Sequence, residues 1–224
     1  MAEWWVLRPA SCDAAVCLGR ARELHVPDQP PRFTMNYAEE FAYWYFRLNG
    51  FFALTNFVVH RGGKIGQSGD VDLVAVRPPF TFEPIGGQPE DLDERLTRVL
   101  DFRKTIGVIC EVKTGDYNPA KLFPAGKLEY AIGRLGLVPR TSIAEVAIGL
   151  SGAPIFPARD VVFTKVLITK IWKRDHDESH GLRLPLDVVK AFLSARVARY
   201  PIEKYNARML FGGVFQYAAS RANV

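Results

Sequence analysis

Aromatic residues dominate the surface of a helix that the pattern predicts from about Tyr37 to Leu48. Asn36 can cap the first turn, and Gly50 follows the last turn, where glycine commonly ends a helix. The aromatic residues in the middle are Phe41, Tyr43, Trp44, Tyr45 and Phe46. A helix that is apolar nearly all round is usually buried, so we expect these rings to form core rather than a base-stacking platform.

Runs of apolar and β-branched residues predict the strands of a sheet. The expected strands are Phe51–His60, Val71–Val76, Thr105–Lys113 and Asp160–Ile171. A glycine-rich turn over Arg61–Gly69 connects the first two strands, and Pro78 stops the second.

Helical periodicity returns later in the chain. It predicts helices over Gly126–Leu135 and over Pro185–Arg199, with Pro185 at the first helical position, where a missing N–H costs little. Ser142 and Glu145 have the spacing of a capping box, which predicts that a short helix begins at Ser142.

The order of these elements predicts an α/β chain with a mixed central sheet flanked by helices. We expect residues 34–172 to form the core, with an insertion at about 78–104 that starts as a loop and becomes helical over Pro89–Asp101. Residues 1–33 are expected to form an extension that packs on the core through Trp4 and Trp5, and residues 173–224 a helical part of the same domain.

Composition adds a weaker constraint. The chain has 224 residues, 48% of them hydrophobic, and a net charge of +5, which suits a polyanionic partner without requiring one. The cysteines Cys12, Cys17 and Cys110 form no paired spacing, which favours reduced thiols over a disulfide scaffold. Neither a signal peptide nor a run of about 20 apolar residues is present, so we expect a cytoplasmic protein with no membrane partner.

Charged residues at the strand ends are the candidate chemistry. Residues two apart in a strand share a face, so Glu111 and Lys113 point the same way, as do Asp70 and Asp72. A carboxylate near the end of an apolar strand needs a cation or a hydrogen-bond network beside it. Two carboxylates and a main-chain carbonyl form an all-oxygen site suited to Mg²⁺, with Mn²⁺ as a substitute.

The pattern Asp72…Glu111-Val112-Lys113 resembles the PD-(D/E)XK nuclease superfamily. The segments Gly69–Ala75 and Val108–Thr114 look like the strand pair of small endonucleases and archaeal Holliday-junction resolvases in that superfamily. In those families a helix glutamate stands about eleven residues before a glycine-aromatic pair, and Glu39 has that spacing here. The likeness covers roughly residues 36–136 and implies a restriction-endonuclease-like fold.

The resemblance also implies a mechanism. Asp72, Glu111 and the Val112 carbonyl would hold Mg²⁺, and Lys113 would position the attacking water or neutralise charge on the phosphate. Glu39 would bind the metal directly or through water. The expected partner is nucleic acid, DNA rather than RNA, and a homodimer is left open.

The chain departs from the family pattern in several places. Val71 stands where a proline is expected before Asp72, and 38 residues separate Asp72 from Glu111. Asp70 offers a competing carboxylate, which we interpret as a turn or supporting residue. The glutamine-and-tyrosine motif of some relatives is absent, although Lys127 lies in a comparable helix.

Other polar residues carry weaker signals. Contacts to a phosphate backbone are predicted for His60, Arg61, Lys64, Lys121 and Lys127, with solvated positions as the alternative. The stretch Asp175–His180 has two histidines four apart, but its polar surroundings favour a solvated loop over a metal site.

The function expected first is a metal-dependent nuclease that acts in repair, recombination or defence. The alternative is a nucleic-acid-binding or regulatory module on the same fold that does not cut. A structural protein with incidental charged strand ends is the third reading. An intact acidic pair with a lysine favours the first.

Overall fold

The computed structural model describes residues 36–60, 67–171, 181–201 and 203. The predicted N-terminal extension, Arg61, Lys64 and the Asp175–His180 stretch lie outside these residues. All described residues belong to one compact unit. Among them, no helix is both long enough and apolar enough to span a bilayer.

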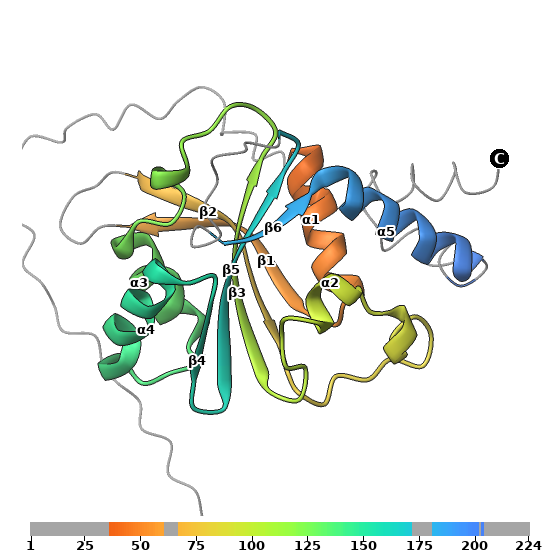
Figure 1. Cartoon of the computed structure of the whole chain (residues 1–224), viewed down its shortest axis with the longest axis horizontal. Coiled ribbons are helices and arrows are strands. Elements are labelled where there is room, and N and C mark those ends of the chain that lie inside the picture. The colour runs from red at the N-terminus through yellow and green to blue at the C-terminus, as the bar shows by residue number, and fades with distance from the viewer. Residues whose placement is uncertain (1–35, 61–66, 172–180, 202, 204–224) are drawn as a thin grey trace, which may run out of the picture. The chain divides into compact units, whose positions relative to one another are not determined.

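A six-stranded mixed sheet forms the centre of the unit, in the order β1-β2-β3-β5-β4, with β6 also pairing with β5 (Figure 1). The strands are β1 (Phe52–His60), β2 (Gln67–Arg77), β3 (Thr105–Lys113), β4 (Ile155–Ala158), β5 (Val161–Thr169) and β6 (Leu182–Pro185). Strands β1, β2 and β3 are successively antiparallel, and β5 is parallel to β3. The predicted mixed α/β architecture is confirmed.

Helices cover both faces of the sheet (Figure 1). Helices α1 (Tyr37–Leu48) and α5 (Leu186–Arg199) pack on one face, and α3 (Ala125–Leu135) and α4 (Ile143–Gly152) pack on the other. Each face has its own hydrophobic core, since alternate residues of β3 enter opposite cores: Val108 and Cys110 lie in the first and Ile109 in the second. Cys110 is therefore buried.

Helix α1 matches its prediction closely. The Asn36 side chain accepts hydrogen bonds from the N–H groups of Ala38 and Glu39 at 2.9 and 3.1 Å. Gly50, with φ +84°, turns the chain into β1 in a conformation that few other residues adopt. The side chains of Tyr45 and Phe46 are fully buried, so this part of the aromatic run is core.

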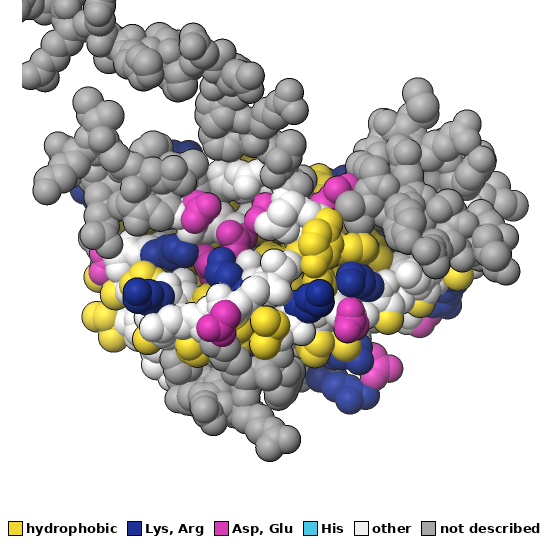
Figure 2. All heavy atoms as spheres, turned by 90° about the horizontal axis from the view of Figure 1, so that it is seen from above, with side chains coloured by type: hydrophobic (Ala, Val, Ile, Leu, Met, Phe, Trp, Pro, Cys, Tyr) yellow, Lys and Arg dark blue, Asp and Glu magenta, His cyan; other side chains and the backbone are white. Residues whose placement is uncertain are grey.

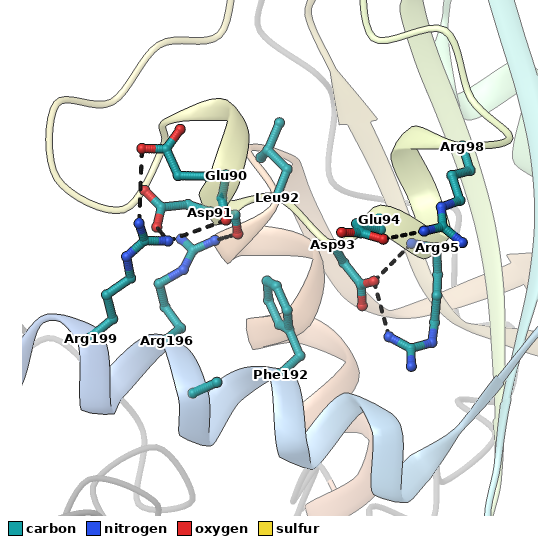
Figure 3. A pocket seen from close by; sticks show the side chains of 11 residues that line it. Glu90, Asp91, Leu92, Asp93, Glu94, Arg95, Arg98, Phe192, Arg196 and Arg199 are labelled. Carbon is teal, nitrogen blue, oxygen red and sulfur yellow. Dashed lines mark hydrogen bonds and ion pairs between the residues drawn. The ribbon is translucent and has the colours of Figure 1, made fainter.

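The segment between β2 and β3 is less helical than predicted. It contains a 3₁₀ turn at Pro89–Asp91 and a single helical turn, α2 (Glu94–Thr97), in place of a helix over 89–101. Arg196 of α5 is buried and joins this segment to the core. It donates to the carbonyls of Leu48 and Gly86 and to that of Asp91 (Figure 3).

Two local predictions are wrong. The Ser142 side chain makes no capping hydrogen bond, because the chain enters α4 directly from a 3₁₀ turn (Arg140–Ser142) and the Ser142 backbone is already helical rather than extended. Pro185 precedes α5 as its N-cap residue instead of occupying its first position. The short strands β4 and β6 were not predicted.

Candidate functional site

The site lies where the pairing of β2 with β3 stops. Their register runs from Arg77 opposite Ile106 to Leu73 opposite Cys110. One position further, the Asp72 carboxylate takes the place of a strand partner: its Oδ2 accepts the Val112 N–H at 2.6 Å. Asp72 is 9% exposed, so a backbone donor and a carboxylate meet in a nearly dry environment.

Lys113 bridges the two acidic side chains. Its Nζ lies 2.8 Å from Asp72 Oδ2 and 2.8 Å from Glu111 Oε2. Glu111 is only 2% exposed. Its second carboxylate oxygen, Oε1, forms an ion pair with the Nζ of Lys127 at 2.6 Å. The structure therefore brings Asp72, Glu111 and Lys113 together and adds Lys127 as a second cation.

Lys127 reaches the site from the first turn of α3. Its Nζ also lies 3.4 Å from the carbonyl of Leu122, in the segment that leads into the helix. The sequence placed Lys127 near the site as a weak phosphate contact. Its direct pairing with Glu111 depends on how α3 packs against β3, which no local pattern reveals.

Glu39, in the first turn of α1, lies within electrostatic reach of Asp72 and Lys113. Burial raises the pKa of Glu39, the charge of Asp72 raises it further, and Lys113 opposes the shift. The side chain is half-buried and accepts a hydrogen bond from the Asn36 side chain, so it also supports the helix cap.

Burial and neighbouring charges have opposing effects on the pKa values of Glu111 and Lys113. Burial and the charge of Asp72 raise the pKa of Glu111, while Lys113 and Lys127 hold it down. Burial would lower the pKa of Lys113, but the charges of Glu111 and Asp72 outweigh it and the pKa is raised. With all groups ionised, three carboxylates and two ammonium groups give a net charge of −1.

The Val112 carbonyl points to the β2 side of β3, the side from which Asp72 accepts the Val112 N–H. In an extended strand the N–H and C=O of one residue point to the same edge, and the Val112 N–H points to Asp72. The next carbonyl, that of Lys113, points to the other edge and accepts the Lys170 N–H at 3.1 Å.

The donor set suits a hard divalent cation held in part by water. The described residues contain no group of three or more His, Cys, Asp and Glu side chains placed to hold a metal, so a cage made only of protein side chains is not available there. Mg²⁺ does not need such a cage, because it is commonly bound by one or two carboxylates together with water and substrate phosphate. Asp72, Glu111 and the Val112 carbonyl supply that number of oxygens.

Of the other predicted residues, Asp70 and Lys121 form no hydrogen bond or ion pair with this centre in the part of the chain that the structure describes. Asp70 of β2 is exposed, and its register partner on the neighbouring strand β1 is Val58. Lys121 is exposed at the end of a 3₁₀ turn (Pro119–Lys121). His60 ends β1, and its side chain is not described.

Asn56 is a residue that the sequence analysis did not single out. It has φ +55° within β1 and lies between two register pairs of β1 and β2, at the level of Asp72. Asparagine is among the non-glycine residues that best tolerate this conformation. The signal available in the sequence was a single asparagine within a largely apolar strand.

Figure 2 looks down on the end of the sheet at which β3 finishes. Acidic and basic side chains lie next to one another on this face, with apolar side chains beside them. Comparison with protein-family models, curated proteins and solved structures finds no match for this chain.

Proposed function

We propose that the protein is a metal-dependent nuclease of the PD-(D/E)XK superfamily that hydrolyses phosphodiester bonds, with DNA as the preferred substrate. The observation that carries the proposal is the meeting of Asp72 and Glu111 at the point where β2 and β3 separate, with Lys113 between them. Buried carboxylates are costly, and a site that gathers them at an open strand end suits metal-assisted hydrolysis.

The arrangement of elements supports the same assignment. A helix bearing Glu39 precedes an antiparallel β1–β2–β3 unit, and a helical crossover then leads to the parallel strand β5. This is the mixed sheet flanked by helices that the family resemblance implies. We therefore propose a restriction-endonuclease-like fold for residues 36–199.

Asp72, Glu111 and the Val112 carbonyl would hold Mg²⁺, which when bound supplies a polarised phosphate and an acidified water. Lys113 carries three N–H donors and a raised pKa, so it serves as a cation that orients water or phosphate oxygens. Lys127 fixes the second oxygen of Glu111 and so orients that carboxylate. Glu39 acts through water at the edge of the set.

Charge balance agrees with a phosphodiester substrate. The five ionisable groups sum to −1, and a divalent cation changes the sum to +1. That charge is opposite to the charge of one phosphodiester, which favours binding of a substrate phosphate once the metal is present.

The test is incubation of the purified protein with plasmid, single-stranded and branched DNA, in Mg²⁺, Mn²⁺ or EDTA. We expect cutting that needs the metal, and a loss on the order of 100-fold or more for Asp72→Asn and for Lys113→Ala. Lys121→Ala removes an exposed lysine on a neighbouring segment and is expected to retain most of the activity.

Thermal unfolding of each variant separates a lost site from a lost fold. Metal-dependent cutting that survives both Asp72→Asn and Lys113→Ala would contradict the assignment. DNA binding that requires these residues, without cutting of any substrate, would instead identify the non-cutting binding module.

A further inference from the structure

Tyr37, Phe41 and Lys190 form an aromatic and basic cluster, and Tyr37 stands in the same helical turn as Glu39. The Tyr37 and Phe41 rings are 6.5 Å apart between centroids in an edge-to-face arrangement. The Nζ of Lys190, from α5, lies 6.0 Å from the Tyr37 ring centroid and 5.7 Å from that of Phe41. Two rings and an ammonium group thus meet where α1 begins and α5 passes.

The cluster and the site share the first turn of α1. Tyr37 stands two residues before Glu39, and side chains two apart on a helix point in widely different directions. Glu39 lies within electrostatic reach of Asp72 and Lys113, and its side chain accepts a hydrogen bond from Asn36, while Tyr37 packs toward α5. The two sites therefore lie on either side of one helical turn.

Tyr37 is exposed where the other large aromatics of the helix are not. It is 45% exposed, against 7% for Trp44 and 0% for Tyr45. The Lys190 side chain is 38% exposed, and its Nζ lies 3.5 Å from the exposed carboxylate of Asp187. Tyr37 is not among the described residues of the hydrophobic core, and part of its side chain and of the Lys190 side chain is open to solvent.

We propose that this cluster binds one unpaired nucleotide of the strand whose phosphodiester enters the acidic site, with the base stacked on Tyr37 and a neighbouring phosphate on Lys190. The proposal rests on the proposed nuclease function and specifies its substrate class. Exposed aromatic rings stack on bases in single strands, and an adjacent cation follows the backbone. Bases inside a continuous duplex are already stacked and cannot reach the ring, so the substrate is single-stranded, overhanging or branched DNA.

The experiment measures binding rather than cutting. Full-length protein carrying Asp72→Asn is titrated with a labelled single-stranded oligonucleotide and with its blunt duplex, at fixed salt, by fluorescence anisotropy. Adding Tyr37→Ala is expected to weaken single-strand binding by roughly ten-fold and duplex binding by less than about two-fold. Tyr37→Trp keeps a stacking surface and should restore single-strand affinity.

Two further variants separate stacking from charge and from general surface effects. Lys190→Gln should weaken single-strand binding and reduce the slope of log affinity against log salt by roughly 0.7. Phe80→Ala is the matched control. Phe80 is 93% exposed and follows the end of β2 that lies away from the site, so its removal should change neither affinity.

Unchanged single-strand affinity in Tyr37→Ala, an equal loss for duplex and single strand, or no binding of single strands by the Asp72→Asn protein would each overturn the stacking site. These outcomes differ from failure of the nuclease assignment, in which metal-dependent cutting survives both Asp72→Asn and Lys113→Ala. Thermal unfolding of Tyr37→Ala and Tyr37→Trp shows whether any loss comes from the fold.

Discussion

At the scale of single residues, the feature that stands out is the sharing of Glu111 between two lysines. Each of its oxygens has its own ammonium partner, Lys127 on one and Lys113 on the other. Burial of a carboxylate is tolerable only with such compensation, and removal of one partner of a buried pair is strongly destabilising. The raised pKa of Lys113 keeps it an ammonium, so it acts as a donor and a charge rather than as a base.

Glu39 offers a test of the electrostatics without any substrate. Its pKa is raised above 4.5, so the native protein takes up the proton more readily than the unfolded chain. The ionised side chain therefore costs stability above the folded pKa, and that cost disappears as the pH falls. We expect Glu39→Gln to have a higher Tm than Glu40→Gln near pH 7, with the difference gone by about pH 4.

Glu40→Gln is the matched control, since both glutamates lie in the first turn of α1 and both lose the same favourable interaction with the helix dipole. Scanning calorimetry of the metal-free proteins across this pH range makes the comparison. A lower Tm for Glu39→Gln than for Glu40→Gln at neutral pH would show that Glu39 does not face the charge of Asp72.

Strand periodicity was sufficient to predict part of the site. It placed Glu111 and Lys113 on one face of β3, and their side chains pair with each other there at 2.8 Å. The resemblance selected Asp72 over Asp70, and the structure places Asp72 against Lys113 while Asp70 is exposed. The pairing of Lys127 with Glu111 could not be predicted, because it requires the packing of α3 on the sheet.

At the scale of elements, the packing of α4 against β4 depends on a missing side chain. A Cβ at Gly149 would meet the ring of Phe156, which lies in β4, far inside contact distance. The close approach of this helix to the edge of the sheet therefore requires glycine, even though glycine inside a helix is unfavourable by itself.

Gly149→Ala should lower the free energy of unfolding by about 1–3 kcal/mol, because the ring or the helix must move to admit the methyl group. Gly152→Ala in the same helix meets nothing within 4 Å and is expected to be neutral or stabilising by up to about 1 kcal/mol. Urea unfolding of both variants provides the measurement, and equal effects would mean that α4 does not pack as described.

The elements that the sequence predicted and those that it missed differ in length and in the origin of their stability. Helix α1 and strand β3 have long apolar patterns and clear ends, and their predicted bounds are confirmed. Strands β4 and β6 have four residues each and contain Pro157 and Pro185. Such segments become strands only because β5 offers an edge, which is tertiary information.

At the scale of the whole molecule, the segment between β2 and β3 is attached to the helical layer by buried polar groups. The Tyr45 hydroxyl of α1 donates a hydrogen bond to the Asp93 carboxylate at 2.9 Å. The Asp91 carboxylate forms an ion pair with Arg199 and accepts a hydrogen bond from the Tyr200 hydroxyl. The pocket of about 400 Å³ in this region is lined by groups that are largely paired with one another (Figure 3). We interpret the region as a structural junction.

Arg196 is the test of that junction. Arg196→Met should cost at least about 3 kcal/mol of stability, since it leaves the buried carbonyls of Leu48, Gly86 and Asp91 without their donor. Arg98→Met removes an arginine whose pair with Glu94 is exposed on both sides and should cost less than about 0.5 kcal/mol. Chemical denaturation gives the free energy of unfolding of both variants and so shows whether Arg196 stabilises the fold more than an arginine on the surface does.

The two margins of the sheet are unequal, and this sets a limit on assembly. In the described part of the chain the outer edge of β1 has no strand partner, and its nine residues include no Asp, Glu, Lys or Arg. The opposite margin is divided between two four-residue strands that carry prolines. Long uncharged edges accept another strand, whereas short proline-bearing ones do not. Association of copies through their sheet edges would therefore stop at a dimer. Two copies joined through β1 would leave only the β4 and β6 edges exposed, and these edges do not accept a further strand.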